Sequence, residues 1–217
     1  MRKVFQADLQ QIGEELIEMS RLVAIAMDRA WDSLANADVD LAQEVIAADA
    51  KIDFLQNQLD ERAIDTLALQ GPVASDLRMI VGSLRMSASL ERMGDLARHL
   101  AQLTRLRFPN HAIPERISET FAQMAEVDIQ IAKEVGRLLD TRDLAIARAI
   151  IELNHKLDGL HASVFTVIAD ESWDATAPTT VDVSLTSRYL ERFGDHGVSV
   201  ARKVTYLVTG EWDPAEF

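Results

Sequence analysis

Apolar residues recur at intervals of three and four along most of this chain, the spacing of one face of an α-helix. One such run covers residues 9–34, a second covers 41–59 and a third covers 77–100. Gly71 and Pro72 interrupt the pattern between the second and third runs. Since glycine and proline commonly end helices, the pattern predicts three amphipathic helices joined by short turns.

The same pattern then starts again. The stretch RFPNHAIPE at 107–115 contains two prolines and is the best candidate for a linker. Beyond it, helices are predicted over roughly 116–139, 141–171 and 180–209, with a turn at WDATAPTT before the last one. The chain therefore contains two successive sets of three predicted helices.

A repeated motif links the two sets. Residues 90–95 read LERMGD, and residues 190–195 read LERFGD. Over the longer windows 87–101 and 187–201, seven of fifteen positions are identical, whereas unrelated segments would match about once at average composition. We interpret the chain as an internal duplication.

The duplication predicts the fold class: all-α, with two tandem three-helix bundles of antiparallel helices. We place the first three-helix repeat at residues 1–108 and the second at 112–217. The composition agrees, because aromatic residues make up 6% and the 217 residues include only 9 glycines and 5 prolines. Few aromatic and helix-breaking residues favour helices over a sheet.

Charge and composition exclude several functions. The net charge of -13 repels phosphate backbones, so we expect no nucleic-acid partner. The chain has no cysteine, which excludes disulfides, a thiolate nucleophile and a sulfur-ligated zinc. Its N-terminus does not resemble a secretory signal, and no run of 18 apolar residues is present. We expect a cytoplasmic protein without direct membrane insertion.

The repeated motif places acidic side chains one helical turn apart. Glu91 and Asp95 lie at i and i+4, where like charges repel. Asp49 and Asp53 form another such pair on the preceding helix. In an antiparallel hairpin folded about Pro72, residues at equal distances from the turn lie level with each other. Asp53 should therefore face Glu91, and Asp49 should face Asp95.

The second half repeats this arrangement with one difference. By the same geometry, Asp158 should face Glu191, and Asn154 should face Asp195. Four acids are predicted to meet in the first half, and three acids with an amide in the second. A glycine precedes the aspartate in both copies, and its missing side chain lets a neighbouring helix or ion approach.

Clustered carboxylates suit hard or borderline cations such as Mg²⁺, Ca²⁺, Mn²⁺ or non-haem iron. The same acids can instead be solvated surface charges that pair with Arg92 and Arg192. Their repetition and their level partners favour metal ions, with Fe, Mn, Mg, Zn and Ca not distinguished by the residues. The candidate ligands are Asp49, Asp53, Glu91, Asp95, Asp158, Glu191 and Asp195.

These motifs, together with GPVASDLR in the turn and DAKIDFL in the second helix, resemble the PhoU family of bacterial phosphate-uptake regulators. The resemblance covers essentially the whole chain. It implies two three-helix bundles, metal ions on E/D-x-x-x-D motifs at the same seven residues, and a homodimer. It also implies a negative regulator of the phosphate-starvation response that links the ATPase subunit of the phosphate transporter to the phosphate-sensing histidine kinase.

No enzymatic motif is found, so we expect no catalysis. The sequence has no Walker loop, dinucleotide fingerprint, HExxH or GxSxG motif. Two alternatives remain: a ferritin-like carboxylate-bridged metallo-oxidase, and a metal-free helical adaptor. The first needs Glu-x-x-His on two helices, and only Glu152 with His155 fits. Oxygen-dependent Fe²⁺ oxidation would identify the first, and partner binding that survives chelation would identify the second.

Overall fold

The structure, a computed structural model, describes residues 2–211, except for the side chains of 2–4 and 70. Within these limits it contains six α-helices and no strand, which confirms the predicted all-α class. The helices are α1 (Arg2–Asn36), α2 (Val39–Gln70), α3 (Ser75–Arg107), α4 (Glu115–Thr141), α5 (Leu144–Ile168) and α6 (Ala177–Thr209).

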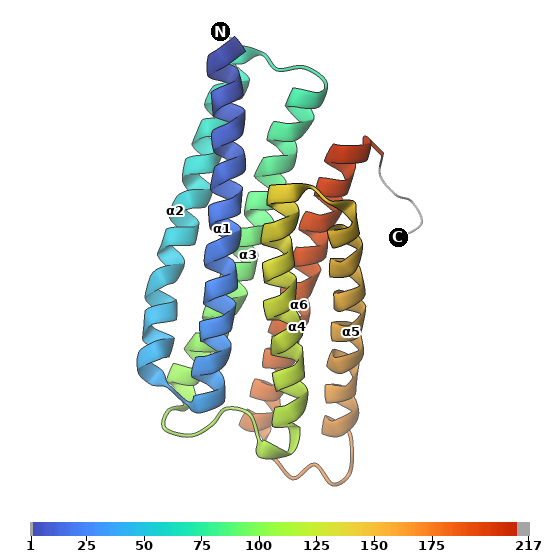
Figure 1. The fold of residues 1–217 in the computed structure, drawn as a ribbon. Helices are drawn as coiled ribbons and strands as arrows, with labels where there is room; N and C mark the ends of the chain where they lie inside the picture. The colour runs from blue at the N-terminus through green and yellow to red at the C-terminus, as the bar shows by residue number, and fades with distance from the viewer. Residues whose placement is uncertain (1, 212–217) are drawn as a thin grey trace.

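The six helices form two three-helix bundles that lie side by side (Figure 1). Helices α1–α3 make one bundle and α4–α6 make the other, so each half of the duplicated sequence forms one unit. The bundles meet where α1 packs against α4 and where α3 packs against α6. Buried apolar residues from both halves belong to one continuous core, so the two units share their interior.

A glycine and an aspartate fix two of the helix ends. Gly71 adopts a left-handed conformation with φ of 53° at the end of α2, a backbone that favours glycine. The Asp143 carboxylate accepts a hydrogen bond from the Ala145 N–H at 2.8 Å, the usual role of an N-cap residue. This cap starts α5 at Leu144, so the helix is shorter than the predicted 141–171.

The predicted apolar faces form the core. Met19, Leu90 and Met93 are fully buried in the first bundle, as are Phe121 and Phe193 in the second. Burying a side chain of this size contributes about 1.5–3 kcal/mol. The helices that carry the acidic motifs are therefore fixed by apolar packing along their opposite faces.

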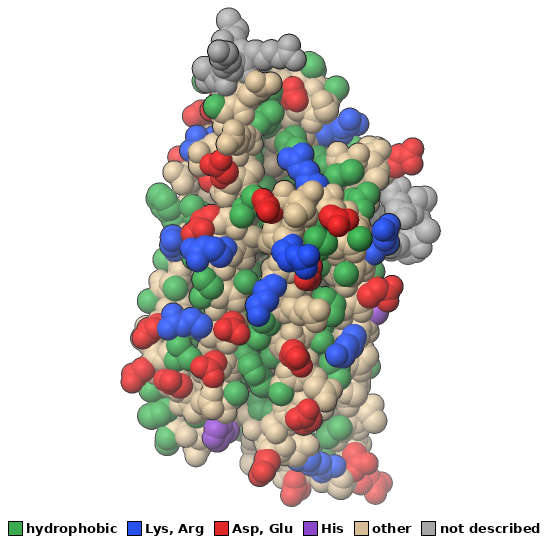
Figure 2. All heavy atoms as spheres, viewed as in Figure 1, with side chains coloured by type: hydrophobic (Ala, Val, Ile, Leu, Met, Phe, Trp, Pro, Cys, Tyr) green, Lys and Arg blue, Asp and Glu red, His purple; other side chains and the backbone are tan. Residues whose placement is uncertain are grey.

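The surface is strongly mixed in charge. On the face shown in Figure 2, acidic and basic side chains are interspersed over both bundles. No helix among the described residues combines the length and apolar character that crossing a membrane requires. On this face, charged side chains thus form small mixed groups rather than one broad patch of a single charge.

Candidate metal centre

The acidic residues of the second half meet at the surface between α5 and α6. Asp158 of α5 and Glu191 and Asp195 of α6 each offer a carboxylate oxygen, and these oxygens all lie within 4.8 Å of one another. Among the described residues, no other set of three histidine, cysteine or acidic side chains meets this closely. The sequence-predicted second cluster is therefore brought together by the fold.

Asn154 extends this cluster toward the interior. Its side-chain amide donates to Asp195 Oδ1 at 3.5 Å, as expected from the predicted level pairing. Its own oxygen is buried and accepts no hydrogen bond. A buried acceptor without a donor is costly, so Asn154 adds an unsatisfied polar group beside the three acids.

Gly194 lets α5 approach α6 at this point. A Cβ atom at position 194 would lie 2.3 Å from Asn154 Oδ1 and 2.5 Å from Leu157 Cδ2. These distances are far inside van der Waals contact, and the contacted atoms belong to well-packed side chains. Only glycine therefore permits this spacing of the two helices, which accounts for the glycine of the LERFGD motif.

The second cluster is electrostatically strained. Burial raises the pKa of Glu191, and the nearby charge of Asp195 raises it further, while Arg188 lowers it. Burial also raises the pKa of Asp158, with Asp195 the next cause in size. Arg188 donates to both Glu191 oxygens at 2.6 Å, but it pairs with Glu191 alone among the three acids.

The first cluster also joins acids of two helices, but an arginine side chain lies between them. The Nε atom of Arg98 lies 2.5 Å from Asp49 Oδ2, and the same guanidinium also pairs with Asp95. Arg92 pairs with the other Asp95 oxygen at 2.9 Å. Arg98 thus joins an acid of α2 to an acid of α3 and stands between them as their counter-charge.

The remaining acids of the first cluster are also close. Burial raises the pKa of Glu91, and Asp95, Asp53 and Asp49 all contribute in the same direction, against Arg92. Burial likewise raises the pKa of Asp49, which Arg98 opposes. Asp49 and Asp95 therefore share Arg98, whereas Glu91 pairs with Arg92 at 3.5 Å.

Comparing the halves explains why the arginine is present in only one. The motif alignment pairs Arg98 with Val198, which is 8% exposed and belongs to the apolar core. Helix α2, which carries Asp49, is the second helix of its bundle, and α5, which carries Asn154, is the second helix of the other. The first cluster has one more acid than the second, and Arg98, which pairs with two of its acids, has no basic equivalent in the second.

Sequence reasoning missed a further acid, Asp128 of α4. Its carboxylate is fully buried, and neither oxygen has a hydrogen-bond partner. Burial raises the pKa of Asp128 well above its usual value, and the charge of Glu191 adds to this. An available indication was its place between Met124 and Ile131 on the apolar stripe of α4, where a charged residue is unusual.

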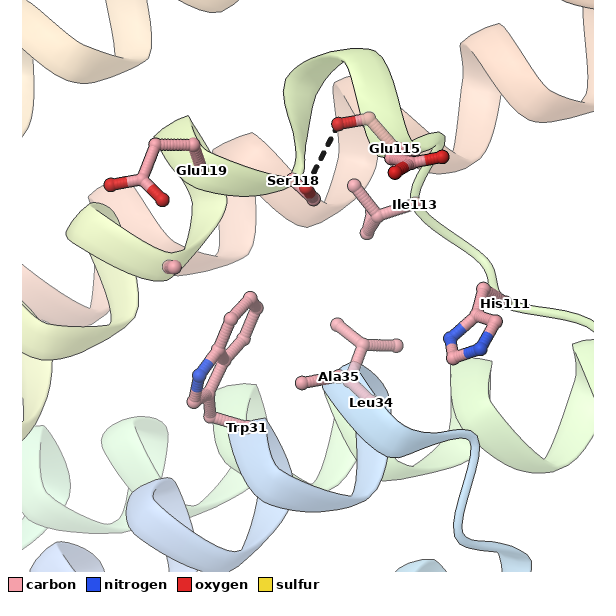
Figure 3. A pocket seen from close by; sticks show the side chains of 9 residues that line it. Trp31, Leu34, Ala35, His111, Ile113, Glu115, Ser118 and Glu119 are labelled. Atoms are coloured by element: carbon pink, nitrogen blue, oxygen red, sulfur yellow. Dashed lines mark hydrogen bonds between the residues drawn. The ribbon is translucent and has the colours of Figure 1, made fainter.

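A different cavity lies between the C-terminal end of α1 and the beginning of α4 (Figure 3). Its volume is about 450 Å³, and Trp31 and Ile113 provide apolar walls beside His111. In Figure 3 the Ser118 hydroxyl donates to the backbone carbonyl of Glu115, at 2.8 Å. The candidate ligands all lie on other helices, so this cavity is not part of the carboxylate clusters.

Two duplicated three-helix bundles, with paired acidic motifs on the second and third helix of each, define a class of tandem-bundle proteins. The model of the PhoU domain matches this chain twice, at residues 16–104 and 121–204. The chain belongs to the PhoU family. The two matched segments fall one in each bundle, so both halves carry the family pattern.

Relatives and solved structures agree with this assignment. Phosphate-specific transport system accessory protein PhoU homolog 2 of Mycobacterium tuberculosis is 41% identical over 210 residues, which cover 97% of this chain and 99% of the relative. Homolog 1 of Mycobacterium leprae is 39% identical over 212 residues, covering 98% and 96%. A crystal structure of PhoU from Pseudomonas aeruginosa superposes with a TM-score of 0.86 at 26% identity, covering 95% of this chain and 100% of that one.

The PhoU structure from Streptococcus pneumoniae supports the fold alone, because it is only 23% identical. Its TM-score is also 0.86, and the match covers 96% of this chain and 99% of that one. The arrangement of two packed three-helix bundles is therefore retained at low sequence identity.

Proposed function

We propose that this chain is a regulator of phosphate uptake that acts by binding rather than by catalysis. The observation that carries the proposal is the family match in both halves, together with relatives named as accessory proteins of a phosphate-specific transport system. In this proposal, a cation held by an acidic cluster controls the binding of partner proteins.

A divalent cation or iron at the second cluster is part of this proposal. Asp158, Glu191 and Asp195 would hold it. Oxygen donors of this kind suit Mg²⁺, Mn²⁺, Ca²⁺ or iron. When bound, the ion supplies positive charge that offsets carboxylate repulsion and ties α5 to α6, so binding also stabilises the folded state.

The first cluster differs in what it needs. Metal binding by Asp49, Asp53, Glu91 and Asp95 stays a prediction, because Arg98 already neutralises two of these acids. A cation there must displace or share space with a guanidinium. We therefore place the stronger metal site in the second half.

The exposure of the ligands favours a regulator over a metallo-oxidase. Asp158 and Asp195 are exposed to solvent and only Glu191 is half-buried, whereas a ferritin-like site lies in the core of its bundle. Fe²⁺ oxidation followed under air is expected to show no turnover above the buffer rate. Turnover that disappears in an Asp158→Asn variant would establish an oxidase instead.

The proposed partners are the ATPase subunit of the phosphate transporter and the phosphate-sensing histidine kinase, with the protein itself acting as a cytoplasmic homodimer. A pull-down of the tagged chain from phosphate-replete cells, followed by quantitative mass spectrometry, tests this. We expect both partners to be enriched over a tag-only control. Their absence from the wild-type sample would contradict the proposal.

A matched pair of variants separates metal-dependent from metal-independent binding. Asp158→Asn with Glu191→Gln removes two second-half charges, and Asp53→Asn with Glu91→Gln removes two at the equivalent first-half positions. Partner recovery should fall in the first variant and persist in the second. Equal recovery in both would favour the metal-free adaptor.

A further inference from the structure

The contact between α3 and α6 is nearly symmetric, and its two ends can be compared position by position. The helices run antiparallel (Figure 1), and the motif repeat relates residues 100 positions apart. A contact at one end therefore has an equivalent contact at the other. Differences between the ends show which side chains the packing itself does not require.

One end is closed by an ion pair. Arg107 of α3 binds Asp182 of α6 through two hydrogen bonds, of 2.5 and 3.0 Å. The equivalent positions at the other end hold Leu207 and Gly82, and a Cβ at position 82 would lie 3.2 Å from a Leu207 methyl carbon. The paired charge of one end is thus replaced by apolar packing at the other.

The apolar end nevertheless carries cations for which no ion pair is found among residues 2–211. A cleft of about 320 Å³ lies beside Gly82 and is lined by Arg78 and Arg85 of α3 and by Lys203 of α6. No carboxylate is among its described lining residues. The positions equivalent to Arg85 and Lys203 are leucines, so bundle packing does not demand a cation at either place.

Lys203 is the most constrained of these groups. Its ammonium donates to the Ser199 carbonyl oxygen at 3.1 Å and to the Ser199 hydroxyl at 2.5 Å, both neutral acceptors. It is half-buried, and within the described part of the chain no carboxylate lies within ion-pair distance of it. Burial lowers the pKa of Lys203, and the repulsion of Arg85 lowers it further.

We propose that this cleft between α3 and α6 binds a small phosphate-type oxyanion through Arg85, Lys203 and Arg78. Arginine presents parallel N–H donors to a tetrahedral oxyanion, and lysine adds a point charge. The anion supplies the counter-charge that Asp182 provides at the other end. The chain has a net charge of -13, so three cations that line one cleft with no acid among its described lining residues are a local concentration of positive charge that suits an anion.

The site is separate from the acidic clusters and does not depend on a metal ion. Lys203 also lines a neighbouring cavity of about 490 Å³ together with Asp158 and Asp195, whereas Arg78 and Arg85 line the proposed site. The test therefore uses full-length protein from which divalent cations have been removed on a chelating resin. The anion-binding result can therefore be interpreted even if the metal proposal fails.

Isothermal titration calorimetry at constant ionic strength tests the proposal, with inorganic phosphate, glycerol phosphate and chloride as titrants. We expect saturable binding of a phosphate group and none of chloride. Tighter binding of inorganic phosphate would identify the free ion as the ligand, and tighter binding of glycerol phosphate would identify a phosphate ester.

The variant Arg85→Leu with Lys203→Leu installs the residues of the equivalent positions, and should weaken binding at least tenfold while keeping the fold. The control Arg107→Leu with Asp182→Gly installs the Leu207–Gly82 pair at the other end and should leave affinity unchanged. Circular dichroism melting verifies that both variants fold. Absence of saturable binding by the wild type, or equal affinity in the Arg85→Leu, Lys203→Leu variant, would overturn the proposal.

Discussion

The two acidic clusters occupy equivalent places in the two bundles but solve the same electrostatic problem differently. In the first half, Arg98 lies between Asp49 and Asp95. In the second half, Val198 replaces that arginine, and Asp158, Glu191 and Asp195 converge without a shared cation.

Duplication therefore preserved the positions of the acidic motifs and changed the counter-charge beside them. An arginine fixed in the chain makes a cluster permanently compensated, whereas a cluster without one depends on its surroundings. Under the proposed function, the second cluster responds to an ion and the first contributes mainly to stability.

The largest expected effect comes from Arg98→Val, which gives the first half the residue found in the second. Asp49 would remain buried without its partner, and breaking a buried ion pair costs about 3 kcal/mol when one member is partly exposed. Urea unfolding of metal-free protein measures the loss. The same variant should gain a stabilising response to Mn²⁺, and unchanged stability would show that Arg98 is not the counter-charge.

Replacing Asp128 is expected to raise the free energy of unfolding, whereas replacing Arg98 lowers it. Asp128→Val should stabilise metal-free protein at pH 8 by about 2 kcal/mol, since a buried carboxylate without partners is lost. Because the pKa of Asp128 is raised in the folded state, its cost is small below about pH 4 and grows as pH rises through the folded pKa.

The gain from Asp128→Val should accordingly increase from pH 4 to pH 8 in parallel urea titrations. The pKa values of Asp49, Glu91, Asp158 and Glu191 are also raised, but both proteins retain these groups. The contributions of Asp49, Glu91 and Asp158 cancel in the difference between the two curves, whereas the coupling of Glu191 to Asp128 is part of the measured effect. A gain that does not vary with pH would mean that Asp128 is not the titrating group.

The two motif glycines should differ in tolerance. Gly194→Ala is expected to destabilise by about 2 kcal/mol through overpacking, because its Cβ would overlap Asn154 and Leu157. At Gly94 the nearest atom, the terminal methyl carbon of Ile52, lies 2.9 Å away and can move. There the gain in helix propensity, about 1 kcal/mol, should offset most of the clash. Thermal melts of both variants, compared with the wild type, would reveal equal losses if this packing difference is absent.

The smallest effect is expected for Arg92→Ala. Arg92 pairs with Asp95, but its side chain is 62% exposed, and exposed ion pairs contribute about 0.5 kcal/mol or less. This variant is the matched control for Arg98→Val, because it removes a cation from the same carboxylate. A loss as large as that of Arg98→Val would locate the compensating charge on the surface instead.

Much of this molecule was predictable from sequence because it follows from periodic patterns. The six helices, the turn at Gly71 and the level pairing of acids across each hairpin all depend on spacing alone. Arg98 was not recognised, because its role depends on reaching a buried acid on another helix. Asp128 was missed for a related reason: counting acidic pairs draws attention to surfaces, whereas this acid interrupts an apolar stripe.

The sequence also did not indicate which of the two clusters is the better candidate for binding a cation. Four acids in the first half suggest a stronger cation site than three acids with Asn154 in the second. The structure pairs Arg98 with Asp49 and Asp95, and it brings three carboxylates together in the second half. Which acids share a centre depends on side-chain placement to within a few ångströms, and motif spacing does not specify this.

The most direct test of the account is a Mn²⁺ titration of unfolding free energy in two double variants. Wild-type protein should gain about 2.7 kcal/mol at a hundredfold excess over the dissociation constant. Asp158→Asn with Glu191→Gln should abolish this gain, whereas Asp53→Asn with Glu91→Gln should retain it. Loss of the gain only in the first-half variant, or no gain in the wild type, would contradict a metal centre in the second bundle.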